Sequence, residues 1–271
     1  MKLPLNNLSY PIKIAIGNSI GSGFVIGYNG QSFLVTARHV LYQFEPITKK
    51  FLLFDKTVTL LFYAFENNSI QKLPTILKVD LDIIVRDNNI KTNDSIDLVV
   101  LKLADFTQPN LTLANGINIV KHASGGLIHY DMSQSKKFDD VEISEDVFVL
   151  GYPTSLSAKE MNQLDYDVPL IRKGIVGGKN QLNKTIILDC PVYGGNSGGM
   201  VLEVNSENKG IHLIGIVTQF IPYVDRWQNI RSPALTNINL ENSGYSVALP
   251  VDHIFDLAQL VGKAEELGAK G

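Results

Sequence analysis

Gly194-Gly-Asn-Ser-Gly-Gly199 sets a single serine, Ser197, in a run of glycines and leads directly into the apolar stretch Met200–Val204. Glycine readily takes positive φ values and lets other groups approach the backbone closely, so the run predicts a tight turn. The five residues after it are too few for a helix and contain two valines, which favours a strand. The segment therefore predicts a turn that presents a serine at the entrance to a strand.

Short β-rich runs recur along the rest of the chain, separated by Gly, Asn, Asp and Pro. The clearest hairpin joins Phe24–Gly27 to Ser32–Thr36 through Asn29-Gly30, the strongest short turn signal. Many short strands with few helical windows favour an all-β fold of barrels or sandwiches. The further runs predicted as strands are Phe51–Phe54, Val58–Phe65, Thr75–Val79, Leu98–Leu103, Val147–Leu150, Thr185–Leu188, Ile211–Phe220 and Tyr245–Leu249.

Three segments depart from this strand pattern. Apolar residues recur at helical spacing over Asp252–Leu267, which predicts a helix capped by Asp252 and ended by Gly268. Residues 121–145 are polar and contain glycines, which predicts a connector between two β-rich halves. The segment 221–243 is long for a connection between strands, and we expect a loop there. It contains Arg226, Trp227 and Arg231, and the tryptophan is expected to anchor the loop.

Composition excludes several classes of protein. The 271 residues include 24 basic and 27 acidic ones, and a net charge of −3 gives no reason to expect nucleic acid or a membrane surface as partner. No apolar run has the length of a spanning helix, and the first residues lack the apolar core of a signal peptide, which favours a cytoplasmic location. The single cysteine, Cys190, excludes an internal disulfide and a multi-cysteine metal site. We expect Cys190 to be a small buried hydrophobic residue.

Two further segments carry residues that fit the chemistry of a reactive serine. Leu34–His39 is a β run that ends in a histidine, and Asp97 stands directly before the apolar run Leu98–Leu101. A serine hydroxyl becomes a good nucleophile when an imidazole removes its proton, and the imidazole needs a carboxylate to fix its tautomer. Backbone N–H groups in a tight turn can stabilise the oxyanion that forms.

Each of these residues also has a purely structural interpretation. A serine among glycines is usually part of a turn, a lone histidine is usually structural, and an aspartate before a strand can simply cap it. Asp97 is preferred over Asp82, Asp87 and Asp94, because the apolar run that follows Asp97 would place its carboxylate at the edge of a core. The occurrence of His39, Asp97 and Ser197 in one chain predicts a catalytic triad, with the histidine as base, the aspartate as its orienting group and the serine as nucleophile.

A different serine-hydrolase motif is also present, because Gly195-Asn-Ser-Gly-Gly199 satisfies Gly-x-Ser-x-Gly. In the α/β-hydrolases this motif joins a strand to a helix, and the triad follows in the order serine, acid, histidine. Here a strand pattern follows the serine. Of the downstream histidines, His212 lies in an apolar strand and His253 in the first turn of the terminal helix. The α/β-hydrolase interpretation is therefore weak.

Taken together, the motifs resemble those of the trypsin-like, chymotrypsin-fold serine peptidases of the disulfide-free bacterial kind, similar to the protease domain of high-temperature-requirement proteins. The resemblance implies an all-β fold of two antiparallel six-stranded β-barrels with a C-terminal α-helix. The barrels would span residues 12–120 and 146–250, with the connector at 121–145 and the helix at 251–271. The matching segments, in family order, are Gly21–Ile26, Leu34–Val40, Asp97–Leu101, Val149–Pro153, Gly195–Gly199, Gly215–Val217 and Gly244–Pro250.

The same resemblance implies further roles around the triad. The backbone N–H groups of Gly195 and Ser197 would form the oxyanion hole, and the Thr218 hydroxyl would support Asp97, although an ordinary strand threonine is an equal alternative. Asn196 stands where some family members have an aspartate that pairs with a newly cut N-terminus, so that activation is not implied. The implied substrate pocket consists of Pro191, Val192, Tyr193, Phe220, Gly244 and Ser246.

The sequence thus predicts a serine endopeptidase that works through an acyl-enzyme on a protein or peptide substrate, without a metal or cofactor. Pro191 occupies the position of the aspartate that selects basic residues in trypsin, so we expect a preference for small or apolar side chains. A binding scaffold that has the fold without turnover is the main alternative, and an esterase is a further one. The oligomeric state stays open.

Overall fold

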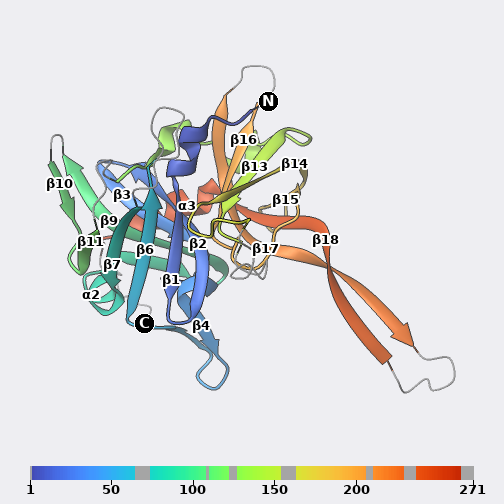
Figure 1. Ribbon diagram of the computed structural model, residues 1–271, viewed down its shortest axis with the longest axis horizontal. Coiled ribbons are helices and arrows are strands. Elements are labelled where there is room, and N and C mark those ends of the chain that lie inside the picture. Colours follow the sequence, from blue (N-terminus) through green and yellow to red (C-terminus); the bar gives the residue numbers. More distant parts are fainter. Residues whose placement is uncertain are drawn as a thin grey trace, which may run out of the picture.

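The computed structural model describes residues 2–64, 74–107, 110–121, 127–153, 163–205, 210–228 and 236–263. Two sheets stand side by side, and a long two-stranded ribbon projects from the second of them (Figure 1). Helices in the described part of the chain are short and lie at the margins of the sheets. The predicted all-β class is confirmed, as is the presence of a C-terminal helix.

The first half of the chain forms a 10-stranded sheet with the path β10-β9-β3-β2-β1-β6-β7-β11, in which β8 also pairs with β9 and β12 with β2. It departs from the expected six-stranded antiparallel barrel, because β10 and β11 extend its two edges and β12 pairs in parallel with β2. The strands are β1 (Pro11–Ile16), β2 (Ser19–Tyr28), β3 (Gln31–Thr36), β6 (Thr57–Tyr63), β7 (Pro74–Asp80), β8 (Ile90–Asn93), β9 (Ile96–Thr107), β10 (Asn110–Leu113), β11 (Ile117–Lys121) and β12 (Tyr130–Asp131). The other elements of this half are η1 (Leu5–Ser9), α1 (Arg38–Leu41), α2 (Leu81–Arg86) and the separate hairpin of β4 (Tyr42–Glu45) and β5 (Lys50–Leu53).

The hairpin of β2 and β3 forms at the predicted turn. Tyr28 lies opposite Gln31, and the two residues between them have positive φ angles, 49° at Asn29 and 73° at Gly30. Such angles at both central positions define the turn whose twist matches a β-ribbon. The Asn29-Gly30 turn therefore fixes the register of β2 and β3, and β3 leads to His39.

The second half closes into a six-stranded barrel in the order β13-β14-β15-β18-β17-β16, as expected. All of its neighbouring strands run antiparallel. The strands are β13 (Asp146–Gly151), β14 (Leu170–Asn180), β15 (Thr185–Asp189), β16 (Met200–Val204), β17 (Ile211–Gln228) and β18 (Thr236–Pro250). Two short turns, η2 (Met132–Gln134) and η3 (Phe138–Asp140), precede this barrel, and α3 (Val251–Leu260) follows it.

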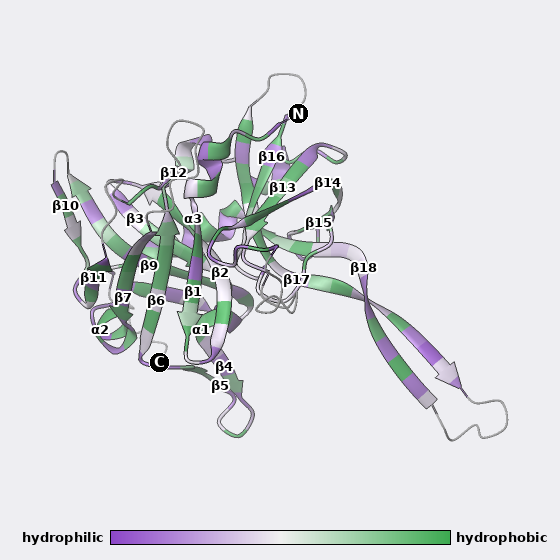
Figure 2. Cartoon of the chain, in the orientation of Figure 1, coloured by the Kyte–Doolittle hydropathy of each residue, from purple (hydrophilic) through white to green (hydrophobic). Residues whose placement is uncertain are grey.

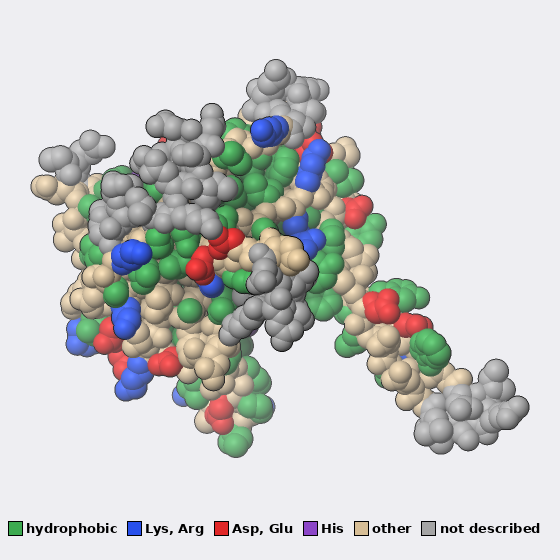
Figure 3. Space-filling model, viewed as in Figure 1, with side chains coloured by type: hydrophobic (Ala, Val, Ile, Leu, Met, Phe, Trp, Pro, Cys, Tyr) green, Lys and Arg blue, Asp and Glu red, His purple; other side chains and the backbone are tan. Residues whose placement is uncertain are grey.

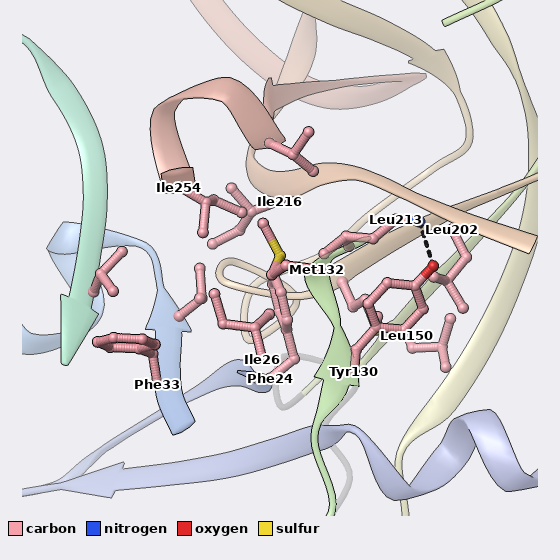
Figure 4. Packing of buried hydrophobic residues seen from close by; sticks show 14 of the residues in the cluster. Phe24, Ile26, Phe33, Tyr130, Met132, Leu150, Leu202, Leu213, Ile216 and Ile254 are labelled. Atoms are coloured by element: carbon pink, nitrogen blue, oxygen red, sulfur yellow. Dashed lines mark hydrogen bonds between the residues drawn. The ribbon is translucent and has the colours of Figure 1, made fainter. Parts of the chain in front are cut away.

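Three clusters of buried apolar residues hold the fold together. One fills the first sheet, one fills the closed barrel, and the third joins the two halves. In this third cluster Phe24 and Ile26 of β2 pack with Leu202 of β16 and with Ile254 of α3 (Figure 4). Tyr130 lies among them, and its hydroxyl accepts a hydrogen bond from the Leu213 N–H at 3.0 Å. The two halves are therefore fixed to each other by a shared core.

The C-terminal helix begins one residue earlier than its predicted cap. It starts at Val251 after Pro250, so the prediction of Asp252 as N-cap is wrong. The Asp252 carboxylate instead accepts a hydrogen bond from the Phe138 N–H at 2.8 Å, which ties the helix to the connector. The helix ends at Leu260, within the predicted range, and the predicted stop at Gly268 lies outside the described residues.

The segment predicted as a long loop is a β-ribbon for most of its length. β17 and β18 remain paired far beyond the barrel, out to Gln228 opposite Thr236. Trp227 does not anchor a loop, since its side chain is 65% exposed and its indole N–H donates to Asp225 Oδ2 at 2.8 Å. Arg226 is also exposed on this ribbon, and Arg231 lies outside the described residues. Alternating side chains favour a strand here even without a core beneath it.

Candidate active site

His39 is presented by the single turn α1, directly after the buried strand β3. Its neighbours Val40 and Leu41 point into the core of the first sheet, which leaves the imidazole half exposed on the opposite side. Val40 packs tightly against β2, because a Cβ added to Gly21 would lie 2.6 Å from its side chain. The buried strand β3 before His39 and the buried residues Val40 and Leu41 after it therefore hold the histidine in place.

Asp97, the second residue of β9, contacts His39 at two points. Its Oδ2 lies 2.6 Å from His39 Nδ1, and its Oδ1 accepts the His39 main-chain N–H at 3.0 Å. An ionised carboxylate only accepts hydrogen bonds, so Nδ1 carries the proton and Nε2 is free to accept one. Burial by itself would raise the pKa of Asp97, but the His39 hydrogen bonds and the charge of Arg38 outweigh it, and the pKa lies below its usual value.

The glycine-rich turn that carries Ser197 requires glycine at two positions. Gly195 and Gly198 have φ angles of 93° and 87°. A Cβ on Gly198 would lie 1.9 Å from the Ser22 carbonyl oxygen, so no other residue fits there. Hydrogen bonds from Gly198 N–H to Val217 O (2.8 Å) and from Ser22 N–H to Ser197 O (3.1 Å) fix the turn against both halves of the molecule.

The Ser197 hydroxyl donates to the main-chain carbonyl of Thr218 at 3.2 Å. Among the described residues no hydrogen bond joins it to His39, although both side chains line the same two cavities. Catalytic hydrogen bonds are often long or misaligned before substrate binds. Thr218 and Asp97 are both described by the structure, and no hydrogen bond joins the Thr218 hydroxyl to Asp97. Thr218 instead contacts the triad through its main-chain carbonyl, which accepts the hydrogen bond from Ser197.

Asn196 shapes the turn with a neutral side chain. It is buried, its N–H donates to Tyr193 O at 2.9 Å, and its Oδ1 accepts the Tyr193 N–H at 3.4 Å. These contacts close a small loop that contains Gly195 and leads into Ser197. Within the described part of the chain the N–H groups of Gly195 and Ser197 donate to no protein acceptor. Two unpaired donors beside a serine can stabilise an oxyanion.

Ser22 is a residue of this site whose role the sequence did not reveal. Its buried hydroxyl donates to Gly195 O at 2.6 Å and accepts the Tyr152 N–H at 2.7 Å. It therefore fixes the carbonyl of Gly195 and with it the orientation of the turn. The motif Gly21-Ser-Gly23 was the one feature of the sequence that could have pointed to Ser22, because its glycines allow neighbouring strands to approach closely.

Two cavities flank Ser197. One, of about 280 Å³, is lined by Val192, Tyr193, Gln219 and Phe220 beside the triad. The other, of about 220 Å³, lies on the side of Ser19–Gly21, Val40 and Phe54. Three of the six predicted pocket residues thus line the first cavity, whereas Pro191, Gly244 and Ser246 are absent from its wall. Ser246 is buried and donates to Cys190 O at 3.0 Å.

Two other groups lack the features of a nucleophilic centre. Cys190 is buried as expected, and burial raises the pKa of its thiol to about 11. A cavity of about 650 Å³ lies between the β2–β3 turn, the connector and α3, and His129 lines it. Ser32, whose hydroxyl is 3.3 Å from His129 Nδ1, is buried and does not face that cavity. His39, Asp97 and Ser197, by contrast, all line one cavity.

In the residues that the structure describes, no helix has the length and apolar character needed to cross a membrane. The same residues contain no group of three or more His, Cys, Asp or Glu side chains arranged to hold a metal ion.

Comparison of the sequence with known protein families identifies the family of this chain. The family model of the trypsin-like peptidase domain matches residues 21–216, well over half of the chain. The chain belongs to this family, and its class is that of the serine endopeptidases. No curated protein sequence is similar enough to count as a relative.

Several solved structures share the fold. The HtrA-type protease AlgW, solved with a tripeptide, is 16% identical at a TM-score of 0.50, over 94% of this chain and 61% of that one. Deg5 is 17% identical at a TM-score of 0.50, over 94% of this chain and 90% of that one. The protease Anisep from Arthrobacter nicotinovorans is 13% identical at a TM-score of 0.50, over 94% of this chain and 96% of that one. The chain thus spans less than two thirds of AlgW, and at these identities the likeness concerns the fold.

Proposed function

We propose that this peptidase hydrolyses peptide bonds through an acyl-enzyme on Ser197, with His39 as general base and Asp97 as its orienting group. The observation that carries the proposal is the two-point contact of Asp97 with His39, made at the mouth of cavities that Ser197 also lines. That contact favours the tautomer with the proton on Nδ1, in which Nε2 is the nitrogen that can accept the proton of the serine.

In the first step the Ser197 hydroxyl turns from the Thr218 carbonyl toward His39 and gives its proton to Nε2. The serine oxygen bonds to the substrate carbonyl carbon, and the N–H groups of Gly195 and Ser197 stabilise the oxyanion. The C–N bond then breaks, and the amine leaves with the proton from His39. Water deprotonated by the same imidazole releases the acid and restores the serine.

Substrate preference follows from the cavity of Val192, Tyr193 and Phe220. In the described part of the chain Asp97 is the one carboxylate that lines this cavity, and that group is already paired with His39. A lysine or arginine side chain would find no free partner there. We therefore propose small or apolar side chains at the residue bound in this cavity, in line with Pro191 at the position of the basic-selecting aspartate of trypsin.

Labelling with a fluorophosphonate probe tests the nucleophile. The wild-type protein should react, and Ser197→Ala should not. Labelling that persists in Ser197→Ala would overturn the assignment. A folded wild-type protein that does not react would favour the binding scaffold, for which the Ser197–Thr218 hydrogen bond is the specific observation.

Mass-spectrometric profiling of cleavage in a mixed peptide library tests the reaction and the preference together, with Ser197→Ala as the control. Cuts after small or apolar residues, absent from the control, are the expected result. Predominant cuts after Lys or Arg would contradict the proposed pocket. Turnover of simple esters without any peptide cleavage would identify an esterase.

A further inference from the structure

The distal part of the long ribbon, Pro222–Gln228 of β17 with Thr236–Asn242 of β18, is here named the arm. It extends away from the closed barrel, and no other element covers it on the face seen in Figure 3 (Figures 1 and 3). A two-stranded ribbon without a core is marginally stable in water. The arm is therefore a surface that gains stability from a partner.

One face of the arm carries three aliphatic side chains beside polar ones. Val224 lies opposite Leu240 and Arg226 opposite Ile238, and residues paired in this way share a face. Val224, Ile238 and Leu240 are 44%, 56% and 65% exposed. Tyr223, Asp225 and Trp227 occupy the intervening positions of β17 and belong to the other face. Along the arm part of β18 hydrophobic and hydrophilic residues alternate (Figure 2). Three neighbouring exposed aliphatic side chains on one strand pair are typical of a contact surface.

The arm is continuous with the candidate active site. β17 separates from β16 after Ile216, which lies opposite Met200. From there the same strand passes Ser197 at Thr218, lines the 280 Å³ cavity with Gln219 and Phe220, and runs into the arm. Among the described residues no strand pairs with this edge of β17 between Gln219 and Trp227.

We propose that this edge is a track for an extended segment of the substrate, which continues from the cleft along the arm and pairs with it as an added strand. The proposal rests on the function proposed above. Main-chain hydrogen bonds to the edge would supply affinity, and apolar side chains of the substrate would lie beside Val224, the aliphatic residue of β17 on that face. Pro222 has no N–H to donate, as is common on edge strands.

Continuity favours the substrate over a second copy of this chain. A chain bound at Ser197 reaches the arm simply by remaining extended, at ~3.3 Å per residue. The partner that fits is thus an unfolded or extended polypeptide with alternating apolar residues. Peptides that fill only the cavity beside Ser197 would bind without using the arm.

Trp227, the single tryptophan of the chain, reports on the arm directly. Tryptophan-free peptides are titrated into the Ser197→Ala protein while the emission of Trp227 is recorded. The short peptide spans the cleft alone, and two long ones continue with alternating valine and threonine on either the N-terminal or the C-terminal side. We expect one long peptide to shift the emission and to bind roughly tenfold or more tightly than the short one, because a buried aliphatic side chain contributes about that factor.

The test variant is Val224→Thr, which removes the aliphatic side chain of β17 next to the added strand and keeps a strand-forming residue. It should lose the gain of the long peptide. Leu182→Thr is the matched control, because Leu182 is 91% exposed at the turn between β14 and β15, and it should keep the gain. Equal affinity for short and long peptides in the parent protein would overturn the proposal.

Two further readouts separate the remaining outcomes. If the arm variant changes the molar mass measured by light scattering and peptide length has no effect, the arm binds a second copy and the proposal is wrong. Fluorophosphonate labelling of the wild type tests the chemistry on its own. A labelled protein without a length effect contradicts the arm alone, whereas an unlabelled protein that binds the long peptide contradicts the catalytic proposal and supports the arm.

Discussion

The hydrogen bonds of Asp97 decide which nitrogen of His39 carries the proton. An amide at this position keeps the size of the side chain but offers an N–H toward Nδ1, which stabilises the wrong tautomer. We expect Asp97→Asn to remain folded and to lose about 10⁴-fold in kcat on a peptide substrate. Steady-state kinetics together with the thermal midpoint check this, and a loss of less than tenfold would refute the proposed role of Asp97.

Ser22 is a positioning residue, since it acts through the Gly195 carbonyl. Ser22→Ala should lower kcat by about 10- to 100-fold, less than the loss of an oxyanion donor itself. It should also destabilise the fold by roughly 1–3 kcal/mol, because the Tyr152 N–H loses its buried partner. The readout is kcat per labelled serine beside the free energy of unfolding in urea.

Ser32→Ala is the control for this experiment, since Ser32 is also buried but lies away from the turn. It should lower stability without changing kcat. If Ser22→Ala likewise changed stability alone, the role of Ser22 would be purely structural.

At the level of elements, the connector is fixed to the barrel by a buried ion pair. Glu203 of β16 is fully buried, and Lys136, which follows η2, bonds its carboxylate. Lys136→Met leaves that carboxylate without its cation and should destabilise the protein by about 3–5 kcal/mol. Replacing both residues by methionine should recover much of this loss, because an apolar pair is often as stable as a buried ion pair.

Urea unfolding of the two single variants and the double variant measures this coupling. A double-mutant cycle isolates the interaction from the separate effects of each substitution. Additive losses would show that Lys136 and Glu203 do not depend on each other.

The elements differ in how well the sequence predicts them. The β2–β3 hairpin and the Ser197 turn follow from local backbone demands, because Gly30 and Gly198 have positive φ angles. The cap of α3 was mispredicted because Asp252 has a tertiary partner, the Phe138 N–H, which no local pattern reveals. The contact between Ser22 and Gly195 likewise joins strands from different halves. Local rules thus predict turns, whereas contacts across the shared core require the structure.

The arm illustrates a further limit at the level of the whole molecule. Its alternating side chains have the pattern of strands, but length and the lack of a visible core suggested a loop. Strand pairing there continues because β17 and β18 already leave the barrel as neighbours. The division into two β-rich halves was predictable from the order of motifs, since each motif belongs to one half, and the second half closes into the expected barrel. The extra strands at the edges of the first sheet were not, because short edge strands have weak patterns.

The stability of the whole molecule should fall as the solution becomes mildly acidic, and His129 is one cause. Burial lowers the pKa of His129 below its usual value, against the smaller opposing effect of Asp131. Below about pH 6.5 the unfolded chain therefore binds more protons at this site than the folded one, and the free energy of unfolding decreases until the folded pKa is passed. His129→Gln should reduce the drop in thermal midpoint between pH 7.5 and 5.5. The variant also loses the stacking of His129 on Phe106, at 4.7 Å between ring centroids, so its midpoint at pH 7.5 should be lower as well. The slope with pH is the diagnostic quantity, and the same slope in His129→Gln and the wild type would contradict this origin of the acid sensitivity.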